Sequence, residues 1–204
     1  PASASATIVT GTVPYYHGIT ASEWFSRDAM RQLSILYDRE HKQSPALLAV
    51  STLGDEMKIS TAGESRVFAF APTAESAILS AGHAADGAAW IQQGRWKMST
   101  YYAPVNPWLK SFCRDYVPDA DVNISIAKAA IFCVDKTTVG MDDNVDMLSV
   151  SLTAKPTIDG YLSLDQSLAY LINGITRKIP LSRVLFVVTN RRSEERRVGK
   201  ECRS

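Results

Sequence analysis

The stretch that decides the fold is Asp146-Met-Leu-Ser-Val-Ser-Leu152, an apolar segment typical of a strand in a parallel sheet. After it, apolar residues recur at helical spacing over residues 160–177, which predicts an amphipathic helix. The apolar run at residues 183–189 then predicts a further buried strand. Strand, helix and strand at this spacing form a βαβ unit, so we expect an α/β fold with a largely parallel sheet flanked by helices.

Earlier segments follow the same alternating order. Residues 44–61 are predicted as a helix because a Ser-Pro pair suits its cap and first turn. Residues 66–71 are predicted as a buried strand, and residues 89–102 as a hairpin with a Gln-Gly turn. Prolines bracket a short predicted helix near residues 108–116.

Sites in parallel sheets form beyond the carboxyl ends of the strands. The predicted strand ends lie at Ala71-Pro72, at Leu152-Thr153 and at Thr189-Asn190. A functional site is therefore expected close to these three pairs.

The last 13 residues change the electrostatics of the chain. Residues 192–204 are a charged run that could be a solvated tail. We interpret the run as a sequencing-library adapter translated in frame, and exclude it from the fold. Its five basic and three acidic residues contribute +2, so the formal charge of +1 becomes −1 for residues 1–191. No basic footprint for nucleic acid remains, and no apolar run reaches the roughly 20 residues that span a bilayer.

The cysteines do not indicate a metal site. Cys113 and Cys133 stand apart from any cluster of ligands, so both are predicted to be small buried hydrophobic residues. Cys202 belongs to the excluded run.

Two sequence blocks carry a family resemblance: Thr7-Ile-Val-Thr-Gly-Thr-Val-Pro-Tyr-Tyr-His-Gly-Ile19 and Ala77-Ile-Leu-Ser-Ala-Gly-His-Ala-Ala-Asp-Gly-Ala-Ala-Trp90. Together with Ser44-Pro45 and residues 52–58, 94–102, 146–151 and 160–165, in this order, they resemble the alkaline phosphatase superfamily. The similarity is to its bacterial phosphomonoesterase and type I phosphodiesterase/nucleotide pyrophosphatase branch. The resemblance implies that residues 1–191 are a partial alkaline-phosphatase-like domain, truncated at both ends, with an inserted hairpin subdomain at about residues 89–118.

The resemblance also implies a chemistry. In this family two zinc ions position a phosphoryl group and activate a Thr or Ser nucleophile. The nucleophile position falls on Ser3, which is equally compatible with a turn residue. The Asn that helps hold the phosphate falls near Ser22. The Lys and Arg that bind phosphate in phosphomonoesterases fall on Thr73 and Glu75, and Glu75 would repel a phosphate dianion.

The metal-binding segments depart from the family pattern. A loop that carries Asp and His is missing between Thr153 and Asp159, and Asn190 stands where the family has an Asp-His pair. Asp159 is predicted to cap a helix rather than to bind metal. We therefore assign no metal ligand and expect that this chain binds no zinc.

Other polar residues are assigned to structure. His17 and His83 are predicted to be structural turn residues, and His41 to lie in a polar loop. The adjacent pairs Asp55-Glu56 and Asp142-Asp143 do not face one another on a helix, and are predicted to be solvated.

Three hypotheses about function follow. The first is a catalytically degenerate superfamily member that serves as a scaffold, with a protein as its partner. The second is an active metal-dependent phosphatase or phosphodiesterase that uses Ser3 on a phosphate ester. The third is an interaction module using Trp96, Tyr101, Tyr102 and Trp108, although such aromatics more often pack in a core. The resemblance implies a periplasmic or cell-surface location.

Overall fold

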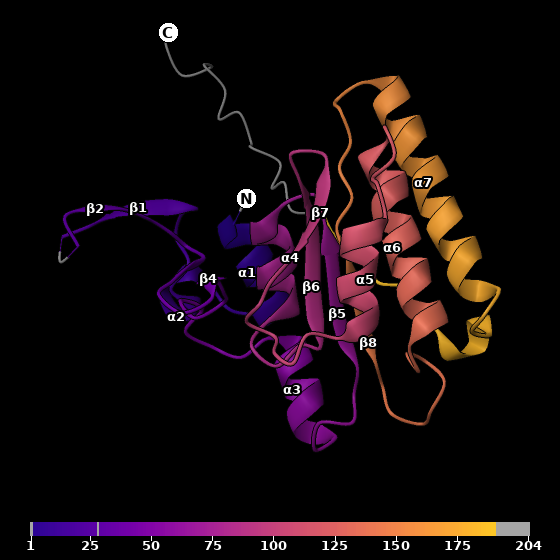
Figure 1. The fold of residues 1–204 in the computed structure, drawn as a ribbon, viewed down its shortest axis with the longest axis horizontal. Helices are drawn as coiled ribbons and strands as arrows, with labels where there is room; N and C mark the ends of the chain where they lie inside the picture. Colours follow the sequence, from indigo (N-terminus) through magenta and orange to yellow (C-terminus); the bar gives the residue numbers. More distant parts are fainter. Residues whose placement is uncertain (1, 28, 191–204) are drawn as a thin grey trace, which may run out of the picture.

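The computed structural model describes residues 2–27 and 29–190, which form a sheet with helices on both faces (Figure 1). The central sheet has the strand order β7-β6-β5-β8. Strands β6, β5 and β8 run parallel, and β7 is antiparallel to β6. The strands are β5 (Val67–Ala71), β6 (Gly87–Gln92), β7 (Arg95–Met98) and β8 (Met147–Val150). This arrangement confirms the predicted α/β class and the largely parallel sheet.

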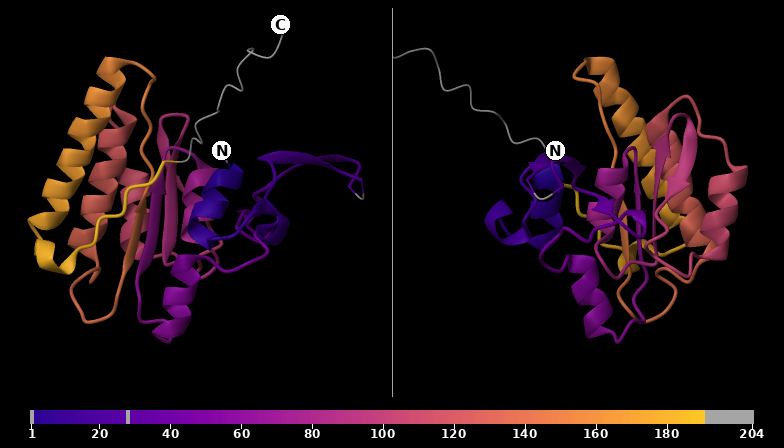
Figure 2. Two further views of the ribbon diagram at one scale, coloured as in Figure 1. Left: turned by 180° about the vertical axis from the view of Figure 1, so that it is seen from behind. Right: turned by 60° about the vertical axis from the view of Figure 1, so that its left-hand side comes forward.

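Two groups of helices cover the sheet. Helices α1 (Ala2–Thr10) and α4 (Ala74–Ala81) pack on one face. Helices α5 (Pro107–Asp115) and α6 (Val122–Lys136) pack on the other, and α7 (Ile158–Thr176) lies outside α6 (Figure 2). Helix α3 (Leu53–Ser60) lies beyond one end of the sheet. The sheet therefore separates two apolar clusters, one for each group of helices.

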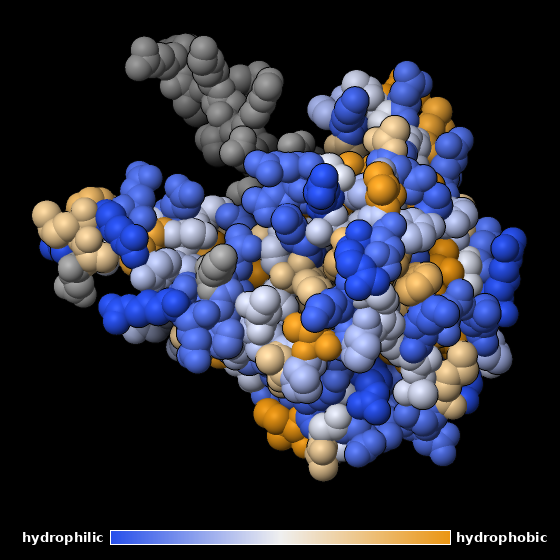
Figure 3. Space-filling model, in the orientation of Figure 1, coloured by the Kyte–Doolittle hydropathy of each residue, from blue (hydrophilic) through white to orange (hydrophobic). Residues whose placement is uncertain are grey.

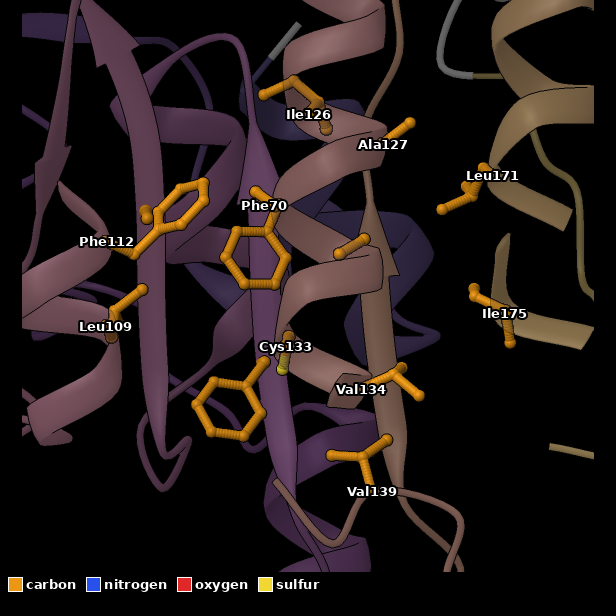
Figure 4. Close-up of a cluster of buried hydrophobic side chains, with 14 of the residues drawn as sticks. Phe70, Leu109, Phe112, Ile126, Ala127, Cys133, Val134, Val139, Leu171 and Ile175 are labelled. Atoms are coloured by element: carbon orange, nitrogen blue, oxygen red, sulfur yellow. The ribbon is translucent and has the colours of Figure 1, made fainter. Parts of the chain in front are cut away.

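Strand β5 supplies both clusters, and all five of its residues are buried. Phe68 and Phe70 point to the α5–α6 side, where Phe70 lies near Phe112 and Ile126 (Figure 4). Ala69 and Ala71 point to the opposite side, toward α1 and α4. Successive strand side chains face opposite ways, so one short strand places large rings on one face and small methyl groups on the other.

The N-terminal region forms smaller elements at one side of the body. They are the short helix α2 (Pro14–His17) and the antiparallel pairs β1 (Glu23–Ser26) with β2 (Arg31–Ser34) and β3 (Tyr37–Asp38) with β4 (Lys42–Gln43). The β1–β2 hairpin projects away from the sheet (Figures 1 and 2). Trp24 packs against the α1–α4 cluster, whereas Phe25 is 56% exposed. On the face shown in Figure 3, hydrophilic residues predominate and apolar residues form separate small groups.

The predicted hairpin is present and belongs to the main sheet. Gln93 and Gly94 have φ angles of 52° and 69°, as a two-residue primed turn requires. The turn joins β6 to β7, and β6 pairs in parallel with β5. Helix α5 and strand β8 also lie where the sequence predicts them, and α7 begins two residues earlier than predicted.

The helix predicted at residues 44–61 is wrong in its first half. Helix α3 begins only at Leu53, because Thr52 and Asp55 form a capping box there. The Thr52 hydroxyl accepts from the Asp55 N–H at 3.2 Å, and the Asp55 carboxylate accepts from the Thr52 N–H at 2.8 Å. Residues 44–52 are irregular, and the Ser-Pro pair lies in a turn.

The strand predicted at residues 183–189 is also wrong. A short 3₁₀ turn at Leu181–Arg183 is followed by residues that join no sheet in the described part of the chain. Val184 and Phe186 pack against the α5–α6 cluster, but Leu185 is 86% exposed. The run alternates as a strand would, but its backbone lacks a ladder partner among the described residues. Residues 191–204, with the proposed adapter sequence, lie outside the described residues.

Cys113 and Cys133, the two cysteines within the described residues, are free, and Cys133 is buried in the α5–α6 cluster. Burial raises the pKa of the Cys113 thiol to about 12 and raises that of Cys133 further. Burial therefore disfavours the thiolate form of both residues, and Cys133 is buried as predicted, whereas Cys113 is half-buried. Within the described residues, we find no helix with the length and apolar character needed to cross a membrane.

Close contact between α6 and α7 gives a first test of the packing. A Cβ atom at Gly174 would lie 2.1 Å from Ile131 Cδ1. Gly174→Val should therefore lower the free energy of unfolding by about 1–3 kcal/mol, measured by urea denaturation. The exposed neighbour provides the control, because Asn173→Val should change stability by about 0.5 kcal/mol or less. Equal effects at the two positions would contradict this packing.

Candidate functional site

The candidate site lies where β5 ends and α4 begins. Ala71 ends the strand, and Thr73 caps the helix after a single proline. The Thr73 hydroxyl accepts from the Ser76 N–H at 3.3 Å and donates to Ser76 Oγ at 3.0 Å. Thr73 is therefore engaged in capping α4. Its place beyond the carboxyl end of a parallel strand agrees with the predicted site region.

Glu75 and Ser22 meet at this corner. Glu75 lies in the first turn of α4, and Ser22 directly precedes β1. The Ser22 hydroxyl donates to Glu75 Oε2 at 3.0 Å, and both residues are half-buried. The positive end of the α4 dipole favours a carboxylate there. The structure thus brings together two positions that the resemblance aligned with phosphate contacts, but the pair formed is acidic.

Ser3 lies at the same end of the molecule. It belongs to the first turn of α1, which packs beside α4, and the N-terminal end of α1 is on the side of the β5 carboxyl end (Figure 1). Ser3 is half-buried, and its hydroxyl makes no hydrogen bond with any described residue. Among the described residues, the Ser3 hydroxyl at this helix N-terminus therefore has no hydrogen-bond partner, and it makes no contact with Ser22 or Glu75.

The connection from β8 to α7 is short, and hydrogen bonds from α6 hold it in place. The Asn123 side chain donates to the Thr153 carbonyl at 2.6 Å and accepts from the Thr153 N–H at 2.9 Å. Thr157 then caps α7 by accepting from the Gly160 N–H at 3.1 Å. Asp159 is exposed in the first turn of α7. The prediction that Asp159 is the cap is therefore wrong, because the Thr157 hydroxyl already accepts the free N–H.

His17 is a structural residue, as predicted. Its side chain is fully buried, Nδ1 accepts from the Ile19 N–H at 3.1 Å, and Nε2 lies 3.1 Å from Thr7 Oγ1. Burial lowers the pKa of this imidazole below its usual value. Since Nδ1 accepts from an amide, the neutral ring with a hydrogen on Nε2 satisfies both contacts.

Asp55 is buried, so the prediction that it is solvated is wrong. Its carboxylate accepts from the N–H groups of Thr52, His83 and Ala84 at 2.7–2.8 Å, and lies 3.1 Å from His83 Nδ1. Burial by itself would raise the pKa of this carboxyl, but the hydrogen bonds from His83, Thr52 and Ala84 outweigh it and hold the pKa at about 2. Its neighbour Glu56 is exposed, as predicted.

The other predicted polar residues lie apart from the corner. His41 packs edge-on against Tyr101, with ring centroids 5.4 Å apart. Asp142 is half-buried and accepts from the Asn144 N–H at 2.9 Å, whereas Asp143 is exposed. None of these residues approaches Ser22 or Glu75 through a hydrogen bond in the described part of the chain.

The residues present do not fit a zinc site. Across residues 2–27 and 29–190, no three His, Cys, Asp or Glu side chains gather as metal ligands would. Asp55 and His83 are an Asp-His pair in contact, but both oxygens and both ring nitrogens already bind protein atoms. A metal there would displace contacts that fasten α3.

The candidate aromatics pack mostly inside the protein, which favours core packing over an interaction surface. Trp96 and Tyr102 are buried, and Trp108 contacts Phe68 and Phe132. The Tyr102 hydroxyl donates to the Gly82 carbonyl at 2.7 Å.

Comparison with solved structures defines the class of fold. The crystal structure of wild-type alkaline phosphatase PafA superposes with a TM-score of 0.77 at 22% identity, covering 88% of this chain and 50% of that one. A PafA variant gives a TM-score of 0.76 at 21% identity. The chain therefore has the alkaline-phosphatase-like α/β fold, over about half the length of these structures.

Sequence relatives place the chain more closely, although no protein-family model matches it. It is 33% identical over 126 residues to a calcium-transporting ATPase of Myroides odoratus, and 31% identical over 125 residues to alkaline phosphatase PhoV of Synechococcus elongatus. Each match covers 55% of this chain and 23% of the relative. Alkaline phosphatase PhoK of Sphingomonas is 35% identical over 96 residues, which is 42% of this chain and 17% of that protein. These matches confirm the resemblance to the alkaline phosphatase superfamily of hydrolases, and the chain spans about a quarter of the relatives' length or less.

The hydrogen bonds to Asp55 predict that the free energy of unfolding falls at acid pH. The folded pKa of about 2 lies below the ordinary 3.8, so this carboxylate contributes about 2 kcal/mol above pH 4, which is lost as the pH falls toward 2. Asp55→Asn should cost about 3–5 kcal/mol at pH 7, because buried donors lose their charged partner. The difference from the natural chain should shrink below pH 4 in urea denaturation series.

The exposed Asp143→Asn is the control and should alter stability by about 0.5 kcal/mol or less at every pH. A pH-independent difference between Asp55→Asn and the natural chain would show that the Asp55 charge does not contribute.

Proposed function

We propose that this chain is the scaffold of an alkaline phosphatase superfamily protein that has lost catalysis of phosphate ester hydrolysis. The observation that carries the proposal is the hydrogen bond from Ser22 to Glu75. These two positions correspond, through the resemblance, to an Asn and a basic residue that hold phosphate. The hydroxyl and the carboxylate here satisfy one another instead.

The charge at this corner opposes a phosphate ester. Two like charges about 4 Å apart near a protein surface repel by about 4 kcal/mol, and a phosphate monoester carries up to two negative charges. Glu75 therefore weakens binding at the place where a basic side chain would strengthen it.

The connection between β8 and α7 supports the same proposal. Residues 151–157 cross directly to α7, and Asn123 fastens Thr153 on the way. The resemblance places an Asp and a His in this connection, and neither is among residues 151–157. A degenerate member would act through a protein partner, in the periplasm or at the cell surface, and cell fractionation with an antibody would test that location.

One observation favours the alternative of an active phosphatase or phosphodiesterase. The Ser3 hydroxyl has no partner among the described residues and lies in the first turn of α1. Free N–H groups at a helix N-terminus stabilise negative charge, which suits an attacking alkoxide or a bound phosphate ester.

Zinc content and hydrolysis, measured together, distinguish a degenerate scaffold from an active phosphatase or phosphodiesterase. The protein should contain no stoichiometric zinc, and should hydrolyse p-nitrophenyl phosphate and its bis-ester no faster than the Ser3→Ala variant does. Near-stoichiometric zinc with turnover abolished by Ser3→Ala would overturn the proposal and establish Ser3 as the nucleophile.

Charge reversal at Glu75 tests, by phosphate binding and without any assay of activity, whether Glu75 weakens phosphate binding at this corner. Glu75→Arg should raise the affinity for inorganic phosphate at least about tenfold, because one repulsion is replaced by a charge-assisted contact. Titration calorimetry measures the change, and circular dichroism verifies folding. Glu75→Gln, which removes charge without adding a donor cation, should give a smaller gain. Equal affinity in all three proteins would contradict an electrostatic role for Glu75.

A further inference from the structure

Residues 44–52, the connecting segment, join β4 to α3 and are irregular. We propose that this segment is a pH-sensitive strap, held to the body by His83 in its doubly protonated form and released when His83 loses a proton. The proposal is independent of catalysis, since it concerns residues away from the Ser22–Glu75 corner.

The geometry around His83 requires two ring hydrogens. Nδ1 lies 3.1 Å from Asp55 Oδ2, and Nε2 lies 3.0 Å from the Leu48 carbonyl oxygen. An ionised carboxylate and a carbonyl can only accept hydrogen bonds. A neutral imidazole has one N–H, so one of the two contacts would then bring two lone pairs together. Both contacts are satisfied only by the imidazolium ion.

The Leu48 contact is the one that deprotonation breaks. Asp55 is fixed by three backbone N–H groups, and its charge holds a hydrogen on Nδ1. Nε2 then faces the Leu48 carbonyl without a hydrogen. That carbonyl belongs to an irregular segment, so the segment moves more readily than the capped start of α3.

The strap borders a shallow surface hollow. Leu48, Ala49, Val50 and Ser51 line one side of the hollow, and Asp55, Ile59, His83 and Ala84 line the other. The Leu48 side chain is buried in the α1–α4 cluster and anchors the segment, so loss of the His83 contact would move the Leu48 carbonyl and change the wall of this hollow.

Other charged and titratable groups near His83 lie against partners of their own. Asp86 binds Lys58 at 2.8 Å and accepts from the Val67 N–H at 2.7 Å. Tyr101 and Tyr102 line a second hollow, on the other side of His83, and burial raises the pKa of both phenols. Asp55 is therefore the charged group that sets the protonation of His83.

The sign of the effect follows from the hydrogen bond to Asp55, which raises the pKa of His83 although burial opposes it. A raised folded pKa stabilises the attached strap fully below the ordinary value of 6.5, and this stabilisation is lost as the pH rises through the folded pKa. His17 also contacts the strap, through its backbone carbonyl, which accepts from the Ala49 N–H at 3.1 Å. This contact does not involve the His17 ring, so the pH dependence of the strap comes from His83.

Nuclear magnetic resonance on the whole chain tests the proposal. The His83 ring should titrate above pH 6.5, and the backbone amides of Ala49 and Val50 should shift with the same midpoint. The hydrogen-exchange protection factor of the Ala49 amide, corrected for intrinsic rates, should fall at least about tenfold between pH 6 and pH 9.

His83→Gln should abolish the pH dependence at Ala49, whereas His41→Gln is the matched control and should leave it unchanged. If His83→Gln fails to fold, the natural chain still tests the proposal, because the His83 ring and the Ala49 and Val50 amides should titrate with the same midpoint. A His83 ring that titrates without any change at Ala49 and Val50, or a ring that is neutral at pH 6, would overturn the proposal.

Discussion

The carboxylate of Asp55 joins parts of the chain that are distant in sequence. It closes the capping box of α3, accepts from the backbone of His83 and Ala84 just after α4, and lies against the His83 ring. Gly82 makes this approach possible: it adopts a φ of 78°, and a Cβ there would lie 2.2 Å from Thr52 Oγ1. The end of α4, the start of α3 and the entry to β6 are therefore positioned by one buried charge, which is stable because donors surround it.

The same scaffold presents the corner at the opposite end of α4. The helix fixed by Asp55 at its C-terminal end carries Thr73 and Glu75 at its N-terminal end. Two positions that the resemblance aligns with phosphate contacts thus lie together, while their charge differs from that implied by the resemblance. Changes of charge at this half-buried helix start leave both apolar clusters untouched, because Thr73 and Glu75 belong to neither cluster.

The sequence predicted the elements whose pattern is local. Strand β5 is a continuous apolar run, the β6–β7 turn has a Gln-Gly pair, and α7 has an apolar face at helical spacing. Two errors came from local caps, at Thr52 for α3 and at Thr157 for α7, and a third from pairing between distant residues. The run at residues 183–189 has strand character, but its pairing depends on a partner that no local pattern specifies.

The site could be predicted only in part, for a similar reason. Alignment placed Ser22 and Glu75 at phosphate-contact positions, yet their mutual hydrogen bond depends on how the β1–β2 hairpin approaches α4. Thr52-x-x-Asp55 carried the signal of a capping box, and would have placed the start of α3 correctly. The alanines of β5 have one more consequence: because Ala69 and Ala71 let α4 lie close to the sheet, methyl groups inside the core determine how far Glu75 stands from its hairpin partner. A larger side chain at Ala69 or Ala71 would push α4 away from the sheet, and so would displace the Glu75 carboxylate.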